Sequence, residues 1–343
     1  MRKAQILFIV CILIITVFCP NYASGQNSWT QSLYFENDLF TGTDQNYTNG
    51  IKLSLISPDL SPYAKEGKLP RKVLEFIHQI PFISKSGENY THKVEFSIGQ
   101  NIYTPSDISR HELMPDDRPY AGWLYASTSY HRKNVVNNVA DFMDTVELQL
   151  GMVGPASFAE DTQKFVHKTF DRPLPNGWNN QLANEPGLVI AFERKWLFPP
   201  GLSGFGYDAI THLGAAAGNV HTYLNGGLEA RLGWNIPRNF GVSLIRPAGS
   251  TRLAVNEAFS LYFFWAVDGR AVIHDIFLDG NTFTDSHSVD KKFFYADMAG
   301  GVTISYRKFM FTWAQILRTR EFVRQKENHA FGALSLTFQL SSF

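Results

Sequence analysis

The sequence contains only two cysteines among its 343 residues, Cys11 and Cys19, and both lie in the first 19 positions. The rest of the chain therefore forms no disulfide. Its later apolar runs, such as Phe259 to Val267, are much shorter than the roughly 20 residues that a membrane-spanning helix needs. The 31 Lys and Arg residues balance 31 Asp and Glu residues, and a near-neutral chain gives no electrostatic reason to expect a nucleic-acid partner.

Common catalytic signatures are also missing. The sequence has no G-x-S-x-G nucleophile elbow, and Pro115 stands where an H-E-x-x-H motif starting at His111 would need its second histidine. Residues 285–287, Asp-Ser-His, could hold a hydrolase dyad, but the polar surroundings GNTFTDSHSVDKK favour an exposed connection. The Gly-rich segment 296–302 precedes no helix and so suits close strand packing better than phosphate binding.

The N-terminal segment has the pattern of a secretory signal peptide. Two basic residues, Arg2 and Lys3, precede an apolar run over residues 6–18, and small residues follow shortly before Gln26. We expect residues 1–25 to be the signal and 26–343 to be one exported domain. A lipoprotein anchor at Cys19 is the disfavoured alternative, because a bulky phenylalanine precedes it. Two of the basic residues leave with the signal, so 29 face 31 acidic ones.

The remaining chain repeats segments in which polar and apolar residues alternate, which is the period of a β-strand with one apolar face. Within residues 145–152 one face carries Val146, Leu148, Leu150 and Met152, and the other carries Thr145, Glu147, Gln149 and Gly151. Residues 93–98 and 228–234 follow the same pattern, with Glu229 and Arg231 opposite the apolar set. Alternation alone fits both a soluble sandwich and a membrane barrel.

Several features favour the barrel. The chain is exported without cysteines, its strands reach about ten residues, it is rich in aromatics, and it ends in Phe343. The ending AFGALSLTFQLSSF is similar to the last strand of outer-membrane barrels, although the apolar residues from Leu334 to Leu340 alternate out of step with Phe343. We therefore predict an all-β, antiparallel transmembrane barrel in the outer membrane.

Thirteen candidate strands can be counted. They begin near residues 28, 47, 92, 119, 143, 187, 207, 221, 256, 269, 292, 307 and 329. Bacterial single-chain barrels have an even number of strands because both termini lie in the periplasm. Strand directions counted from the two ends conflict between about 187 and 278, so the error is placed there. Twelve or fourteen strands are possible.

One segment, residues 157–169, predicts a short helix instead. Ser157 and Glu160 have the spacing of a capping box, and acidic residues in the first turn with lysines later complement the helix dipole. If the first strand runs outward, this helix and the bend at residues 38–46 both lie on the extracellular side.

Two groups of residues on that side could carry chemistry. Gln163 and His167 are four apart on the predicted helix and project from one face, where the imidazole could accept a proton from water. The bend near Asn37 and Asp38, with Thr48 on the returning strand, offers oxygens of the kind that bind hard cations. Taken separately, each has a plain alternative, because a surface histidine near a helix C-terminus and an Asx-rich turn are both common.

Five motifs in order give the chain a family resemblance. They are F-E-N-D at 35–38, Y-T-N-G at 47–50, D-R-P-Y-A-G at 117–122, the Q-x-x-x-H of Gln163 and His167, and N-N-Q-L-A-N-E-P-G at 179–187. The chain resembles the outer-membrane lipid A 3′-O-deacylase family over nearly its whole mature length. The resemblance implies a twelve-stranded barrel that removes the 3′-linked acyloxyacyl group of lipopolysaccharide by calcium-dependent hydrolysis.

The resemblance also implies the roles of particular residues. Asn37 and Asp38 match the family's pair near the metal, Thr48 matches its threonine after the tyrosine, and Gln163 and His167 match its helical pair. The expected mechanism is attack by water that His167 activates, with Ca²⁺ or another divalent cation stabilising the oxyanion. The expected partners are lipopolysaccharide and outer-membrane lipid, with no nucleic acid and no obligate protein partner. An outer-membrane phospholipase and a non-catalytic pore or structural barrel are the alternatives.

Overall fold

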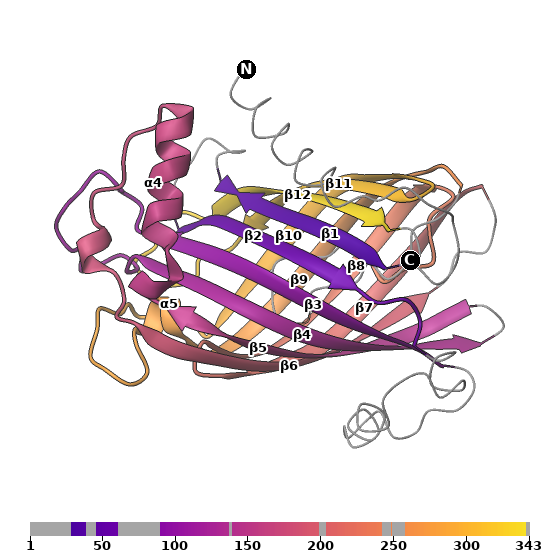
Figure 1. Ribbon diagram of the computed structural model, residues 1–343, viewed down its shortest axis with the longest axis horizontal. Helices are drawn as coiled ribbons and strands as arrows, with labels where there is room; N and C mark the ends of the chain where they lie inside the picture. Colours follow the sequence, from indigo (N-terminus) through magenta and orange to yellow (C-terminus); the bar gives the residue numbers. More distant parts are fainter. Residues whose placement is uncertain are drawn as a thin grey trace.

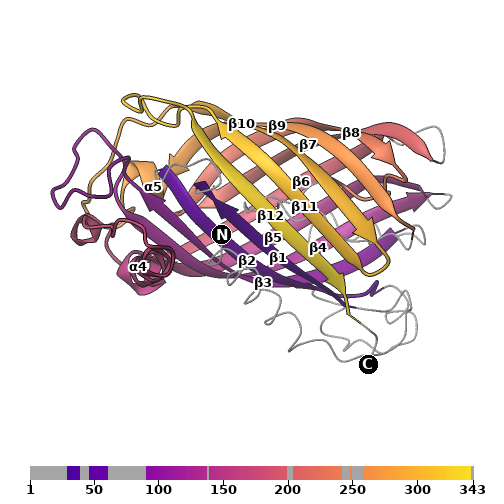
Figure 2. The same cartoon turned by 90° about the horizontal axis from the view of Figure 1, so that it is seen from above.

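A closed antiparallel barrel of twelve strands makes up most of the protein. The structure is a computed structural model that describes residues 29–38, 46–60, 90–136, 139–198, 204–241, 248 and 258–340. Each strand pairs with its neighbours in the sequence, and the first pairs with the last, so the described strands leave no open edge (Figures 1 and 2). The strands are β1 (Thr30–Asn37), β2 (Asn46–Ile56), β3 (Tyr90–Thr104), β4 (Ala121–Val136), β5 (Val139–Val153), β6 (Glu185–Phe198), β7 (Phe205–Gly218), β8 (His221–Trp234), β9 (Ser260–Asp275), β10 (Phe294–Tyr306), β11 (Phe309–Arg318) and β12 (His329–Gln339).

The expected even number of strands is confirmed, and the extra candidate strand is wrong. The segments expected near residues 256 and 269 form one strand, β9. Asp268-Gly269 has the composition of a turn, yet both residues stay in register with β10, and the Asp268 carboxylate accepts a hydrogen bond from Arg270 Nε at 2.8 Å in the lumen. A polar lumen therefore accepts a sequence that would end a strand elsewhere.

The barrel closes where β1 meets β12. Their register runs from Thr30 opposite Gln339 to Asn37 opposite Gly332, and a hydrogen bond of 2.9 Å joins the hydroxyls of Ser32 and Thr337 across the seam. The first strand begins and the last strand ends at the same end of the barrel. We assign that end to the periplasm and the opposite end to the exterior. Residues 1–28 and 341–343, which include the expected signal peptide and Phe343, lie outside the described residues.

The alternating strands bury their polar face, and this decides between a membrane barrel and a soluble sandwich. Glu147 and Arg231 are 0% and 1% exposed, whereas Leu150 and Trp234 are each 53% exposed. Ion pairs fill the lumen, including Lys52 with Glu95 at 3.4 Å. An apolar outer surface around a charged interior is stable in lipid and not in water. Within the described residues, no helix is long and apolar enough to cross a membrane.

The predicted helix exists, but its start differs from the expectation. Helix α4 spans Ala159–Phe170, and its N-cap is Phe158 in the left-handed region at φ 57° with no side-chain cap. The Ser157 hydroxyl donates to the Gly154 carbonyl at 2.6 Å instead, within the single turn η2 (Pro155–Ser157). The capping box was therefore wrong, because a tight turn uses Ser157. The acidic first turn and basic last turn are as expected.

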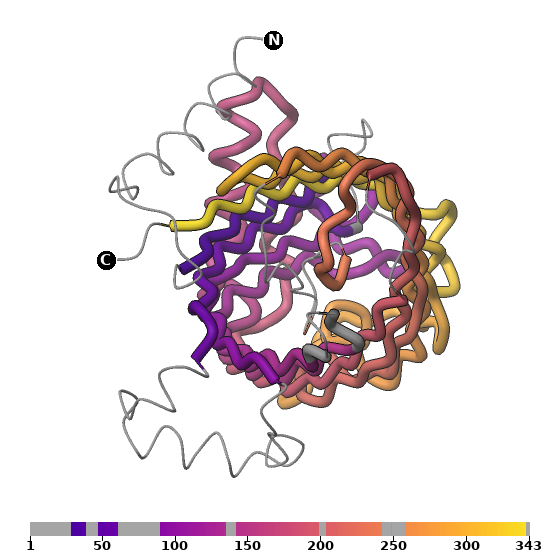
Figure 3. The backbone as a smooth tube through the Cα atoms, turned by 90° about the vertical axis from the view of Figure 1, so that its right-hand side faces the viewer, coloured from indigo at the N-terminus to yellow at the C-terminus, as the bar shows by residue number. Residues whose placement is uncertain are grey.

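Helix α4 lies outside the barrel ring, across its extracellular end and roughly perpendicular to the strands (Figures 1 and 3). A second, four-residue helix, α5 (Ile276–Asp279), sits over the lumen at the same end. Phe277 of α5 stacks on Tyr103 of β3 with ring centroids 3.9 Å apart. The two helices thus cover different surfaces, because α4 covers part of the outer wall and α5 covers part of the barrel mouth.

Candidate active site

The site begins with a row of residues that crosses the outer wall at the extracellular end. Asn37 of β1 pairs with Asn49 of β2, Asn49 with Ile102 of β3, and Ile102 with Gly122 of β4. Paired residues point to the same side of a sheet, and along β3 this is the side of Phe96 and Ile98, which face outward. Further along β3, Ile98 is 54% exposed, whereas Ile102 is 1% exposed. Something covers the outer wall at this level.

Helix α4 and the turn before it provide the cover. The Gln100 side-chain amide donates to the Ser157 carbonyl at 2.7 Å, and Ile102 packs in one buried cluster with Ala159. A Cβ added to Gly122 would lie 2.2 Å from the Ala159 Cβ and 2.0 Å from the Ser157 hydroxyl oxygen. The final glycine of the D-R-P-Y-A-G motif therefore lets the helix approach the wall.

The wall-facing side of α4 carries the two residues that the sequence singled out. Gln163 is 3% exposed and His167 is 2% exposed, which a surface histidine would not be. The Pro173 carbonyl lies 2.5 Å from His167 Nδ1, and a carbonyl can only accept, so Nδ1 carries the proton. In the neutral ring the lone pair is then on Nε2, the form that a general base requires.

Trp178 fixes the orientation of Gln163. Its indole Nε1 donates to Gln163 Oε1 at 2.8 Å, and because the indole has no acceptor, the amide oxygen must be the atom that faces it. The indole is 1% exposed and its ring centroid lies 4.9 Å from that of Tyr120. The turn η3 (Trp178–Asn180) that carries it follows the return loop from α4. The amide nitrogen of Gln163 is thereby presented as a donor.

The first hairpin contributes the other group. Asn37, Asp38 and Thr48 are 3%, 0% and 3% exposed, and the Thr48 hydroxyl lies 2.7 Å from that of Thr104 at the end of β3. Consecutive buried amide and carboxylate oxygens suit a hard divalent cation such as Ca²⁺. No cluster of three His, Cys, Asp or Glu side chains occurs among the described residues. Further ligands of such an ion would therefore be amide, hydroxyl, backbone, water or substrate oxygens.

The five expected residues lie at one end of the barrel. Asn37 belongs to the row of paired residues that α4 begins to cover at Gly122, and α4 lies at the extracellular end of the barrel in contact with β3 and β4 (Figures 1 and 2). Thr48 joins the same region through Thr104 on β3. Both groups of residues are thus buried at the extracellular end of the barrel.

A polar network braces the loops around this end. Asp117 accepts hydrogen bonds from the backbone amide and hydroxyl of Ser106, at 2.8 and 2.6 Å. Arg118 pairs with Glu321 at 2.5 Å. Burial of the Glu321 carboxyl would raise its pKa, but the guanidinium groups of Arg118 and Arg318 outweigh this and hold the pKa below its usual value. The ion pair between Arg118 and Glu321 joins the loop after β3 to the loop after β11.

The other sequence candidates have structural roles or none. His287 Nε2 lies 2.7 Å from the Asp117 carbonyl, and Ser286 accepts a hydrogen bond from the Asn281 amide at 2.7 Å. His287 and Ser286 therefore do not form a dyad, which agrees with the exposed connection that the sequence favoured. His111 and Glu112 are exposed in the loop between β3 and β4.

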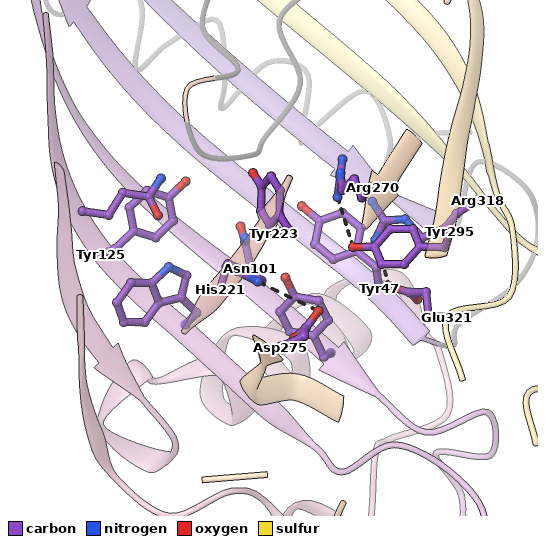
Figure 4. A pocket seen from close by; sticks show the side chains of 13 residues that line it. Tyr47, Asn101, Tyr125, His221, Tyr223, Arg270, Asp275, Tyr295, Arg318 and Glu321 are labelled. Atoms are coloured by element: carbon purple, nitrogen blue, oxygen red, sulfur yellow. Dashed lines mark hydrogen bonds and ion pairs between the residues drawn. The ribbon is translucent and has the colours of Figure 1, made fainter. Parts of the chain in front are cut away.

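The lumen offers a second, less suitable site. Aromatic and charged side chains surround a cavity of about 30 Å³ beneath α5 (Figure 4). Its labelled residues include Tyr47, Asn101, Arg270 and Arg318, which point toward one another from different strands. A cavity of this size holds about one water molecule and no lipid chain. The outer wall under α4 is therefore the better candidate.

Comparisons with known proteins identify the family of the chain. The family model described as outer membrane protein LpxR matches residues 7–340. The chain belongs to the LpxR family. This is the lipid A 3′-O-deacylase family that the motifs resemble, so the protein is an outer-membrane hydrolase.

One solved structure supports this fold, and others are more distantly similar. LpxR from Salmonella typhimurium is 19% identical, with a TM-score of 0.70 over 90% of this chain and 99% of that one. The β-domain of the Bordetella autotransporter BrkA is 7% identical, with a TM-score of 0.43 over 93% of this chain and 100% of that one. A comparison with curated proteins finds no match.

Sequence reasoning missed three parts of the site. Trp178 and the Pro173 carbonyl, which orient Gln163 and His167, and Gly122, which seats the helix, received no role. Gly122 and the residues after Trp178 lie within motifs that were recognised, so the signal was present. Their roles depend on contacts between segments that are far apart in the sequence, and periodicity cannot show such contacts.

Proposed function

We propose that the site between α4 and the outer wall hydrolyses the ester of the 3′-linked acyloxyacyl group of lipid A in lipopolysaccharide. The observation that carries this proposal is the burial of Gln163 and His167 on the wall face of α4. The row of paired residues that starts under this helix at Gly122 ends at Asn37. A hydrolase that acts on a membrane lipid needs its reactive groups on the lipid-facing side of the barrel. The luminal side would not meet such a substrate.

His167 is the general base in this proposal. The Pro173 carbonyl holds the Nδ1 proton, so Nε2 takes a proton from water as the water oxygen attacks the ester carbonyl. The carbonyl oxygen becomes an oxyanion, and the alkoxide on the sugar leaves with a proton returned from the imidazolium. The products are a free acyloxyacyl carboxylate and the 3′ hydroxyl. No covalent enzyme intermediate is required.

Gln163 and the first hairpin stabilise the oxyanion. Trp178 holds the amide oxygen of Gln163, so the amide nitrogen can donate toward developing negative charge. Asn37 and Asp38 would hold a divalent cation, which when bound supplies a positive charge near the reacting carbonyl. Thr48 positions the returning strand through its contact with Thr104.

The test is hydrolysis of purified lipopolysaccharide by variants in detergent, with the released fatty acids and residual lipid A identified by mass spectrometry. We expect His167→Ala to reduce the rate by about 1000-fold and Asp38→Ala by about 100-fold or more. His111→Ala is the matched control, because His111 is exposed in an outer loop. Full activity in either site variant would remove the role assigned to that residue.

Removal of divalent cations tests the role of the hairpin. We expect a chelator to lower the rate of the parent enzyme by about 100-fold and added Ca²⁺ to restore it. The Asp38→Ala variant should respond to neither treatment, because its binding group is absent. An equal response in both proteins would place the cation elsewhere.

The same assay distinguishes the alternatives. Release of fatty acid from glycerophospholipid with lipid A unchanged would indicate a phospholipase. Release from neither lipid would indicate a non-catalytic barrel. The family membership and the buried histidine of α4 on the outside of the barrel favour the lipid A ester.

A further inference from the structure

Helix α4 has three distinct faces. Residues three and four apart share a face, and the wall face carries the buried side chains of Ala159, Gln163 and His167. The other side of the helix divides into two flanks. The charged flank consists of Glu160, Asp161, Lys164 and Lys168, and the uncharged flank consists of Phe158 at the N-cap, Thr162, Phe165 and Thr169.

The two hydroxyl groups of the uncharged flank have hydrogen-bond partners within the helix and do not depend on water. The Thr162 hydroxyl donates to the Phe158 carbonyl at 3.0 Å, and the Thr169 hydroxyl donates to the Phe165 carbonyl at 2.8 Å. Both hydroxyls therefore satisfy themselves on their own helix and present methyl groups outward. Phe158 and Phe165 are 59% and 70% exposed. The charged flank differs, because Lys164 and Glu160 form an ion pair of 2.5 Å that solvent can reach.

The direction of the helix places the uncharged flank on the membrane side. The helix starts beside β4, where Ala159 meets Gly122, and runs past β3 in the direction of β2 and β1 (Figure 1). For a right-handed helix with this direction and this wall face, the flank at Thr162 and Phe165 turns toward the body of the barrel. The charged flank turns toward the exterior.

The uncharged flank therefore continues the apolar surface of the barrel. Below the helix, the outer faces of β3 and β5 expose Phe96, Ile98 and Leu150 at 53%, 54% and 53%. These residues face the hydrocarbon of the membrane, as outward residues of such barrels do. Phe158 and Phe165 extend this surface past the wall and up to the level of the candidate site.

We propose that the uncharged flank of α4 holds the hydrocarbon chains of the lipid substrate. This inference rests on the proposed function. The helix then separates the two parts of the substrate: the ester lies at the wall face beside His167, the acyl chains follow the uncharged flank into the leaflet, and the polar head group meets the charged flank with Lys164 and Lys168. Recognition of long chains thus occurs on a surface distinct from the reacting groups.

Spin labels test the location of the flank without using activity. Cys11→Ser and Cys19→Ser remove both native thiols from the full chain, and a nitroxide is then attached at Phe165→Cys or, as the matched control, at Lys168→Cys. The protein is placed in phosphatidylcholine vesicles with and without lipopolysaccharide. We expect lipopolysaccharide to reduce collisions of the label at 165 with a water-soluble nickel complex at least about threefold, and to leave the label at 168 in water. A label at 165 that is unaffected by lipopolysaccharide would overturn the proposal.

Kinetics provide the second measurement. We expect Phe165→Ser to lower kcat/KM on lipopolysaccharide by about 10-fold through KM, since it removes one large apolar contact with the lipid chain, and to leave a water-soluble short-chain ester unaffected. Phe165→Leu should restore most of the loss. Phe283→Ser is the control, because Phe283 is 75% exposed in a loop away from α4. Equal loss on both esters, or no loss on either, would contradict the assignment. If the parent protein hydrolyses neither ester, the proposed function fails, and the labels still report where the flank lies.

Discussion

Two stretches of the same outer wall have opposite characters. On β3, Phe96 and Ile98 are about half exposed and apolar, whereas Gln100, Ile102 and Thr104 on the same face are almost completely buried under α4 and the segment before it. The strand does not change its geometry between them. The difference shows that an additional element excludes solvent from one level of the barrel wall and brings polar groups onto it.

We expect the largest effect when α4 and the turn before it are displaced from the outer wall. Gly122→Val places side-chain atoms where Ala159 and Ser157 now pack, so α4 must move, and we expect at least a 100-fold loss of lipid hydrolysis. Ala126→Val is the control, because Ala126 is exposed on the same face of β4. Both variants should keep the heat-modifiable mobility of a closed barrel, in which unheated folded protein and heated unfolded protein migrate differently on a gel. Normal activity in Gly122→Val would show that the cover is not needed.

A smaller effect should follow from removing the hydrogen bond between Trp178 and Gln163. Trp178→Phe keeps an aromatic ring but removes the donor to Gln163, and we expect kcat to fall roughly 10-fold with KM unchanged. In a double-mutant cycle, Trp178→Phe should have little further effect in a Gln163→Ala background. Trp234→Phe on the lipid-facing wall is the control. Additive losses in the cycle would mean that Trp178 acts on something other than the amide.

A substitution in the loops over the barrel mouth should lower local stability and leave hydrolysis nearly unchanged. Glu321→Gln leaves Arg118 without its buried partner, at a cost of about 3 kcal/mol to the local structure, measurable by hydrogen exchange of residues 319–328. The pKa of Glu321 is lower in the folded protein than in the unfolded chain. The ionised carboxylate therefore stabilises the fold fully above the ordinary pKa of a glutamate, and this stabilisation is lost as the pH falls through the lowered pKa. The parent loops should therefore loosen in acid more than those of the variant. Hydrolysis at neutral pH should change less than about threefold, and a larger loss would connect the mouth to the reaction.

The smallest effect is expected at the edge of the covered region. Thr48→Val removes the hydroxyl contact with Thr104, which is worth about 1 kcal/mol. We expect a several-fold lower rate, measured with purified lipopolysaccharide, and recovery in Thr48→Ser. A serine variant as slow as the valine variant would indicate that the methyl group matters and the hydroxyl does not.

Much of this architecture could be predicted from the sequence because strand period is a local property. The alternation around Glu147 and Leu150 predicted a barrel, and the required even number of strands located the error that proved to be β9. Gln163 and His167 share a helix face through their spacing alone. The exact start of α4 could not be predicted, because the residues that look like a cap are used by the turn at Gly154. Trp178, Pro173 and Gly122 act through distant contacts, so local patterns could not reveal their roles.

The seam between β1 and β12 connects the candidate site to the closure of the barrel. Asn37 has Asn49 on one side and Gly332 on the other, so one proposed cation-binding residue stands on the junction that joins the first strand to the last. The pairing with Asn49 needs only the first hairpin, whereas the pairing with Gly332 needs the closed sheet. The backbone of this residue is therefore held on both sides only in the closed barrel.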